Sequence, residues 1–183
     1  MQTKNMEVHS ISEVHEQCAL LRRSAAATQT KLTDILKSSN GLATLMRLKY
    51  EPVGYDPLDP ARELHLIEQI NQTFTYLASF QAAIELFKMH PEIRSLKLNL
   101  GTEAGADIET EDSRGVVAEV FASVNPANNR KLCQDVAKVA KSHAHHKYVF
   151  FLCPGFQPGM QKSIEEFDSV TVIALDFRFS YPP

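Results

Sequence analysis

The amino-acid sequence predicts an α/β fold in which helices flank a mixed central sheet, with a helical extension at the N-terminus. Three observations lead to this prediction. Apolar residues recur at helical spacing through most of the first 90 residues, short alternating segments follow, and a continuous apolar run comes after one further helical segment. A meander of strands, joined by a helical crossover to another buried strand, forms a mixed sheet with helices packed on it.

The composition is that of a folded protein with a sizeable core. The chain has 183 residues, of which 44% are hydrophobic and 22% are charged, enough for one domain and an extension. No apolar run is long enough to span a bilayer, and the first residues lack a secretory pattern. Cys18, Cys133 and Cys153 are scattered, so we expect reduced thiols in a cytoplasmic protein. The net charge of −3 gives no general attraction to nucleic acid.

The region 1–50 is predicted to be helical. From about residue 10 to residue 39, a narrow stripe recurs at steps of four and three, formed by Val14, Cys18, Leu21, Ala25, Thr28, Leu32 and Ile35. Such a stripe suits packing against another helix, either within the chain or in a homodimer through the N-terminal helices. Asn40-Gly41 is a typical helix stop, and a short helix over 42–49 is predicted after it.

A stiff connector divides the chain at residues 51–60, where EPVGYDPLDP contains three prolines and a glycine. The α/β core is therefore predicted to span 51–183. Asp59 is a favourable N-cap residue in front of Pro60. A helix is thus predicted from Pro60 to about Met89, ending ahead of Pro91.

The remainder of the chain is predicted to be mainly extended. Alternating patterns predict strands at 95–100, 106–110 and 115–124, and Asn125-Pro126 is expected to begin a helix that ends near Ser142. The apolar run YVFFLC is typical of a strand buried on both faces. The last predicted elements are a loop at 154–159, a short helix, and a strand at 170–177.

Two acidic residues stand out within these strands. Alternation along 115–124 places Val117, Glu119 and Phe121 on one face, so Glu119 is a charge on a largely apolar strand and requires a cation or strong hydrogen-bond partner. Asp107, on the preceding short strand, is its neighbour if the two strands pair as a hairpin. Converging carboxylate oxygens suit Mg²⁺ or Mn²⁺.

These residues resemble the metal centre of the PD-(D/E)XK nuclease superfamily, which includes many restriction endonucleases. Gly105-Ala106-Asp107-Ile108 is similar to the first motif of the family, and Val117-Ala118-Glu119-Val120-Phe121-Ala122 to its second. The similarity extends over about Leu64–Phe177. It implies a restriction endonuclease-like core that hydrolyses phosphodiester bonds in double-stranded DNA with Mg²⁺ or Mn²⁺.

The resemblance also implies roles for individual residues. Asp107, Glu119 and the carbonyl of Val120 would hold the metal. The preceding helix often supplies a further carboxylate in this family, for which Glu68 is the first candidate and Glu63 the second. The candidates for contact with DNA follow the second motif and are Asn125, Asn128 and Arg130.

Phe121 departs from the family pattern, because it occupies the position of the motif lysine. Losing one group that stabilises developing charge costs about 3–4 kcal/mol of transition-state stabilisation. Either Lys131, on the following helix, supplies the missing charge, or the protein is an inactive DNA-binding or assembly module on the same fold. A third reading is an unrelated α/β interaction protein whose long helices are the functional surface. As structural alternatives for the single residues, Asp107 caps a turn, Glu119 pairs with Lys131 or Arg130, and Lys131 pairs with Asp135 on the helix surface.

The histidines of SHAHHK form the other notable cluster. His143, His145 and His146 lie between a predicted helix and a predicted strand, with no cysteine pair nearby to complete a four-ligand zinc site. We therefore expect an exposed loop.

Overall fold

A computed structural model describes residues 4–38, 40–101, 104–112, 115–126, 130–161 and 169–177. The chain divides into two compact units, which are Met1–Val14 with Ala78–Pro183, and His15–Leu77. The predicted α/β class, with a mixed sheet flanked by helices and a helical N-terminal region, is confirmed. These units do not coincide with the predicted regions 1–50 and 51–183, and that predicted division stays a prediction.

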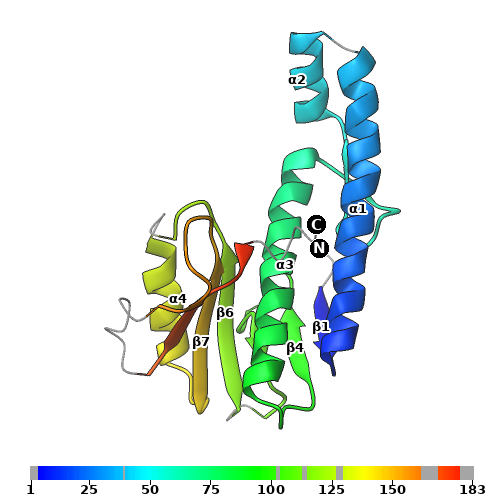
Figure 1. Ribbon diagram of the computed structural model, residues 1–183. Helices are drawn as coiled ribbons and strands as arrows, with labels where there is room; N and C mark the ends of the chain where they lie inside the picture. The colour runs from blue at the N-terminus through cyan, green and yellow to red at the C-terminus, as the bar shows by residue number, and fades with distance from the viewer. Residues whose placement is uncertain are drawn as a thin grey trace. The chain divides into compact units, whose positions relative to one another are not determined.

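The first unit contains a seven-stranded sheet with the order β1-β4-β5-β6-β7-β9-β8 among the described residues (Figure 1). Its strands are β1 (Asn5–Val8), β4 (Leu96–Asn99), β5 (Ile108–Glu109), β6 (Val116–Ala122), β7 (His146–Leu152), β8 (Gly159–Met160) and β9 (Thr171–Ala174). Neighbouring strands from β1 to β6 are antiparallel, and β6, β7 and β9 are parallel. The meander and the crossover to a buried strand were both predicted.

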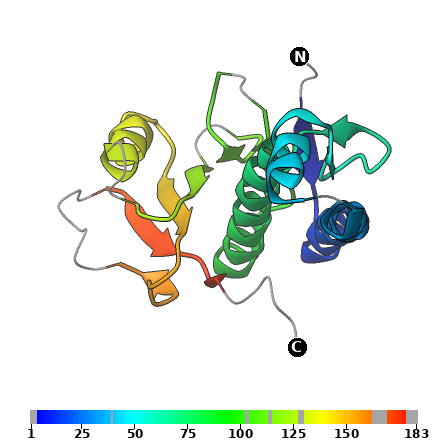
Figure 2. The same cartoon turned by 90° about the horizontal axis from the view of Figure 1, so that it is seen from above.

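Helices cover both faces of this sheet. Figure 2 shows α4 (Lys131–Ala140) on one side of the strands, and α3 (Leu66–Met89) on the other. Only the part of α3 from Ala78 onward belongs to this unit. On the α4 side, apolar residues form one cluster with the helix, which includes Val117, Phe121, Val136, Val149 and Phe151. Glu119 lies on β6 between two members of this cluster, Val117 and Phe121.

The second unit holds most of α1 (Ile11–Ser38), α2 (Gly41–Tyr50), a hairpin of β2 (Gly54–Tyr55) with β3 (Glu63–Leu64), and the start of α3. The side chain of Gln69 joins these elements. Its Oε1 accepts hydrogen bonds from Thr28 Oγ1 at 2.6 Å and from the Tyr55 amide at 3.1 Å. A Cβ at position 54 would lie 2.5 Å from this oxygen, so the close approach requires Gly54.

The helix predicted from Pro60 begins at Leu66 instead. The sequence 51–65, predicted as a non-helical connector and first helical turn, forms the β2–β3 hairpin. The Asp56 carboxylate organises its turn by accepting hydrogen bonds from the amides of Leu58 and Asp59, at 2.9 and 3.2 Å. Asp59 therefore bonds Ala61 within this turn and does not cap a long helix. Strands β1 and β8 were also not predicted, and the short helix predicted after residue 159 lies outside the described residues.

The stripe predicted along α1 is largely buried within the single chain. Cys18, Leu21, Thr28 and Ile35 are each at most 5% exposed, whereas Ala25 is exposed and Ser24 takes its place in the buried set. All three cysteines are free. Within the described part of the chain, none of the helices combines the length and the apolar character that a membrane span requires.

Candidate functional site

Asp107 and Glu119 lie opposite each other on adjacent strands of the first unit. Strands β5 and β6 are antiparallel, with Ile108 opposite Ala118, and continuing this register by one residue pairs Asp107 with Glu119. The two carboxylates are close enough for the charge of Asp107 to raise the pKa of Glu119. The neighbourhood inferred from strand alternation is therefore present in the structure.

The carboxylate of Asp107 is anchored by the backbone of β6. Its Oδ2 accepts a hydrogen bond from the Val120 amide at 2.8 Å. Burial raises the pKa of Asp107, and this effect outweighs the opposing influence of the Val120 hydrogen bond and of the nearby lysines Lys138 and Lys131. The Val120 amide therefore positions the Asp107 carboxylate, and the role of the Val120 carbonyl as a metal ligand stays a prediction.

Glu119 is buried and paired with a lysine that the sequence analysis did not select. Its side chain is 3% exposed, and its Oε1 lies 2.7 Å from Lys138 Nζ. Burial and the charge of Asp107 raise the pKa of Glu119, while Lys138 opposes this shift. Burial disfavours the charged form of Lys138, yet its contact with Glu119 outweighs burial, so its pKa is also raised. The predicted pairing of Glu119 with Lys131 or Arg130 was wrong.

One face of α4 presents three charged side chains to this region. Lys131, Asp135 and Lys138 are spaced by four and three residues, which places them on one face of a helix. Lys131 Nζ donates to Asp135 Oδ1 at 2.7 Å, but the pair is not the surface pair expected for this spacing, because the Asp135 side chain is only 5% exposed. Burial raises the pKa of Asp135, and its buried Oδ2 has no hydrogen-bond partner among the described residues.

The sequence contains a pattern from which the position of Lys138 could have been predicted. The same spacing of four and three that identifies Lys131 and Asp135 continues to Lys138, so all three could have been assigned to one side of the helix. Its Nζ also donates to the Gly105 carbonyl at 2.7 Å. Lys138 thereby joins α4 to the segment immediately before Asp107.

Phe121, which the resemblance would align with the motif lysine, is part of the core. The residue is 5% exposed, and its ring stacks on Phe151 with 5.9 Å between centroids. Lys131 Nζ lies 5.9 Å from the centre of the Phe121 ring, within cation–π range. A lysine from α4 therefore places its charge over Phe121.

The segment between β6 and α4 differs from its prediction. Helix α4 begins at Lys131 and not at Asn125-Pro126, and its N-cap residue Arg130 has a φ of 56°, in the left-handed region that an α-helix cannot extend through. Arg130 and Asn125 are exposed. Asn128 lies outside the described residues. Lys131 is consequently the first residue of the helix.

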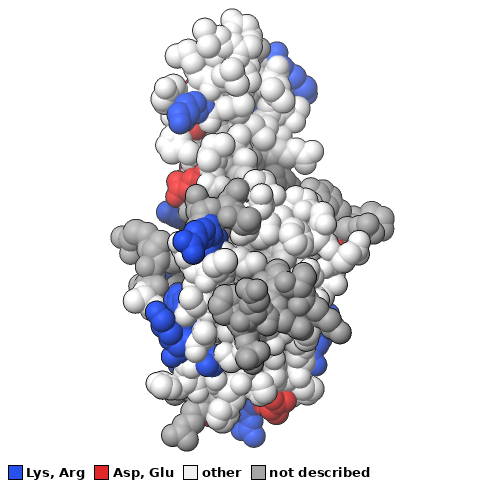
Figure 3. Space-filling model, turned by 90° about the vertical axis from the view of Figure 1, so that its left-hand side faces the viewer, with Lys and Arg blue, Asp and Glu red and all other residues white. Residues whose placement is uncertain are grey.

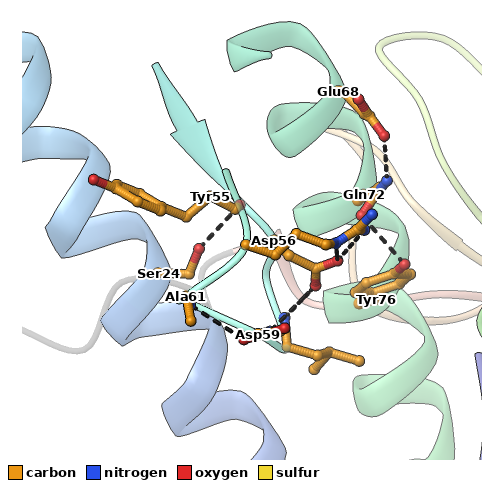
Figure 4. Close-up of polar contacts among 10 residues, drawn as sticks. Ser24, Tyr55, Asp56, Asp59, Ala61, Glu68, Gln72 and Tyr76 are labelled. Carbon is orange, nitrogen blue, oxygen red and sulfur yellow. Dashed lines mark hydrogen bonds and ion pairs between the residues drawn. The ribbon is translucent and has the colours of Figure 1, made fainter. Parts of the chain in front are cut away.

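The candidate carboxylates from the preceding helix lie in the second unit. Glu68 is exposed, and its Oε1 accepts a hydrogen bond from Gln72 Nε2 at 3.1 Å (Figure 4). Glu63 belongs to β3 and pairs with Lys31 at 2.5 Å, so it is not a helical carboxylate. The role of Glu68 stays a prediction.

The histidine cluster is only in part an exposed loop. His143 and His145 are exposed, but His146 begins β7 opposite Val116. The His146 ring contacts the His90 ring at a tilt of 51°, with 4.4 Å between centroids, and His90 Nε2 lies 2.7 Å from the Tyr148 hydroxyl. Among the described residues, no three His, Cys, Asp or Glu side chains form a group arranged to hold a metal ion.

A groove of about 340 Å³ has Lys97, Gly105 and Glu109 among its lining residues, but neither Asp107 nor Glu119 lines it. Asn5 pairs with Asn99 across β1 and β4, and the Asn99 amide donates to the Asp107 carbonyl at 2.9 Å. Asn5, Asn99, Asp107 and Glu119 therefore lie next to one another in a row that crosses the sheet. Figure 3 shows that Lys and Arg side chains on the face in view form separate groups and not a continuous basic surface.

No protein-family model matches this chain, and no curated protein or solved structure matches it either. The resemblance to PD-(D/E)XK nucleases therefore depends on the residues named above and on their arrangement.

Proposed function

We propose that this protein is a DNA endonuclease of restriction-enzyme type that requires Mg²⁺ or Mn²⁺. The observation that supports the proposal best is the cross-strand pairing of Asp107 with Glu119 beside two lysines of α4. Burial raises the pKa values of both carboxyl groups, and a divalent cation between them would neutralise their charge.

The available oxygens are chemically suited to the metal. Mg²⁺ is commonly held by one or two carboxylates, and its remaining positions are filled by water and phosphate. Asp107 and Glu119 would supply these carboxylates. When bound, the metal would supply charge stabilisation and activation of water. Lys138 would then be available to the phosphate in place of Glu119.

Lys131 is the candidate for the missing motif lysine. Its ammonium lies over the Phe121 ring, and its contact with Asp135 holds it on the inner side of α4. A positive charge at this position would stabilise the charge that develops on phosphate during hydrolysis. Lys138 is the second candidate because it directly contacts Glu119.

Double-stranded DNA is the proposed substrate, and the exposed Arg130 and Asn125 are proposed to contact its backbone. Asn128 and the carboxylate of Glu68 belong to the same proposal. We also place the activity in the cytoplasm, with the three free cysteines as support.

A homodimer through the N-terminal helices belongs to the proposal as well. Because the predicted stripe is buried within one chain, the dimer would use the apolar residues that α1 and α2 leave exposed. These are Leu36, Leu42, Leu45, Met46 and Tyr50, with exposures of 55–72%. Light scattering is expected to give the mass of two chains for the wild type and of one for Leu42→Glu with Leu45→Glu.

An inactive binding or assembly module is the alternative. It is favoured by Phe121, which is packed in the apolar cluster, and by the ion pair between Lys138 and Glu119. In this reading the lysines neutralise the carboxylates permanently, and no metal is needed.

Plasmid cleavage with Mg²⁺ or Mn²⁺ distinguishes the two. The wild type is expected to cut, whereas Asp107→Asn and Lys131→Met are each expected to be slower by about 100-fold or more. Glu109→Gln is the matched control, since Glu109 is an exposed carboxylate two residues along the same segment, and it should retain activity. Calorimetry should also show Mn²⁺ binding that Asp107→Asn loses. Metal-independent DNA binding without cleavage would favour the alternative.

A further inference from the structure

A second cavity in the first unit lies between the C-terminal half of α3 and strands β8 and β9. Its volume is about 380 Å³, within the range of small-molecule sites. The buried side chains of Ile84, Ile173 and Leu175 line it. These residues form an apolar wall against which a flat ring could pack.

Gln81 is a buried polar residue that lines this cavity. It is 4% exposed, and among the described residues neither its Oε1 nor its Nε2 has a hydrogen-bond partner. A buried polar atom left unpaired costs about 1–3 kcal/mol. Its neighbours on α3, Phe80, Ala82 and Ala83, are fully buried and apolar, so an apolar side chain at position 81 would have avoided this cost.

The amide of glutamine has a donor and an acceptor side by side. It is therefore complementary to an edge that presents an acceptor beside a donor, such as an amino group next to a ring nitrogen. Adenine and cytosine have this edge, and glutamine pairs with adenine in this bidentate manner. Such a ligand would satisfy both atoms of Gln81 at once.

The charges around the cavity favour a neutral ligand. Glu85 and Lys88 line it and neutralise each other in an ion pair of 2.8 Å. Because Lys88 is already neutralised by Glu85, it offers no net attraction to a phosphate group. An uncharged base or nucleoside does not need such an attraction.

From these observations we propose that this cavity binds a neutral heterocyclic base or nucleoside through Gln81, and that the base has an amino group next to a ring nitrogen. The site is distinct from the carboxylates beside α4 and does not depend on the proposed nuclease activity.

Ligand-detected NMR and thermal unfolding with adenosine and cytidine test the proposal directly. At least one of the two is expected to bind and to raise the melting temperature. Purine riboside, which lacks the amino group of adenosine, should bind at least tenfold more weakly than adenosine if adenosine is the ligand, and adenosine monophosphate should bind no more tightly than adenosine. Absence of binding by both nucleosides at millimolar concentration would overturn the proposal.

Two variants assign the binding to Gln81. Gln81→Leu has a similar volume and no polar atoms, so it should fold, unfold at a higher temperature than the free wild type, and lose at least tenfold in affinity. Gln134→Leu makes the same change at an exposed position of α4 and should leave affinity unchanged. Equal affinity of Gln81→Leu and the wild type would also overturn the proposal.

Discussion

Each of the two units buries acidic side chains, and the surroundings of these charges differ. In the second unit, Asp56 is 1% exposed. It accepts hydrogen bonds from the amides of Leu58 and Asp59 and from Nε and Nη2 of Arg62 (Figure 4). These four donors all lie within six residues of Asp56, so the bonds close one local turn.

In the first unit, three acidic groups from different elements meet near two lysines. The pKa values of Asp107, Glu119 and Asp135 are all raised, with burial as the largest cause. The buried Oδ2 of Asp135 has no hydrogen-bond partner among the described residues. The charge in this cluster is only partly compensated.

The comparison separates a structural carboxylate from a candidate functional group. A fully bonded buried charge contributes to stability, whereas a partly compensated one costs free energy and is characteristic of sites that bind a ligand or perform chemistry. By this criterion Asp56 is structural and the cluster of Asp107, Glu119 and Asp135 is the candidate site.

The largest effect on stability is expected at Asp56. Asp56→Ala removes all four hydrogen bonds at a buried position and should lower the free energy of unfolding by about 3 kcal/mol. Urea denaturation followed by circular dichroism measures this change. Asp59→Ala, at an exposed neighbour with one hydrogen bond to Ala61, should cost about 1 kcal/mol or less. If the two substitutions lowered the free energy of unfolding equally, Asp56 would not have the structural role inferred here.

Glu119→Gln should change stability in the opposite direction. Because the folded-state pKa of Glu119 is raised, the folded protein takes up this proton more readily than the unfolded chain, and the resulting stability is lost as pH rises through the folded pKa. At pH 7 the variant should be more stable by about 0.5–2 kcal/mol. Denaturation from pH 4 to pH 8 should show a flatter profile for the variant than for the wild type. A less stable variant at pH 7 would mean that Glu119 is a structural residue like Asp56.

Replacing the cations should have the smallest effects. The side chains of Lys138 and Arg62 are 52% and 44% exposed, so solvent screens them. Lys138→Met and Arg62→Met should each cost about 1 kcal/mol or less. Lys138→Met should also steepen the pH dependence of stability, because Glu119 loses the group that opposes its raised pKa. An unchanged profile would show that Lys138 does not act on Glu119 in solution.

Local pattern predicted the candidate site better than it predicted the surroundings of that site. Alternation along β6 and the position of Asp107 on the previous strand were sufficient to pair Asp107 with Glu119. The pattern did not identify Lys138 as the partner of Glu119. That contact depends on where α4 begins and how it lies on the sheet, and the predicted start of the helix was five residues too early.

The helix starts show why such boundaries are difficult to predict. Asp59-Pro60 and Asn125-Pro126 both have favourable capping chemistry, yet α3 begins at Leu66 and α4 at Lys131. In the first case Asp56 and the β2–β3 hairpin hold the backbone in a turn. In the second, Arg130 adopts a left-handed conformation immediately before the helix. Contacts and backbone states beyond the local pattern override the capping preference.

The order of helices α1 to α4 and of strands β4, β5, β6, β7 and β9, the mixed sheet, and the apposition of Asp107 and Glu119 follow from periodicity in the sequence, because side-chain direction alternates with a fixed period along a strand and repeats along a helix. Strands β1, β2, β3 and β8 do not follow from it. The tertiary structure alone decided which lysine reaches Glu119, that Phe121 belongs to the core, and that Gln81 lines a cavity. These features depend on distances between residues far apart in the chain, and packing sets such distances where local preference cannot.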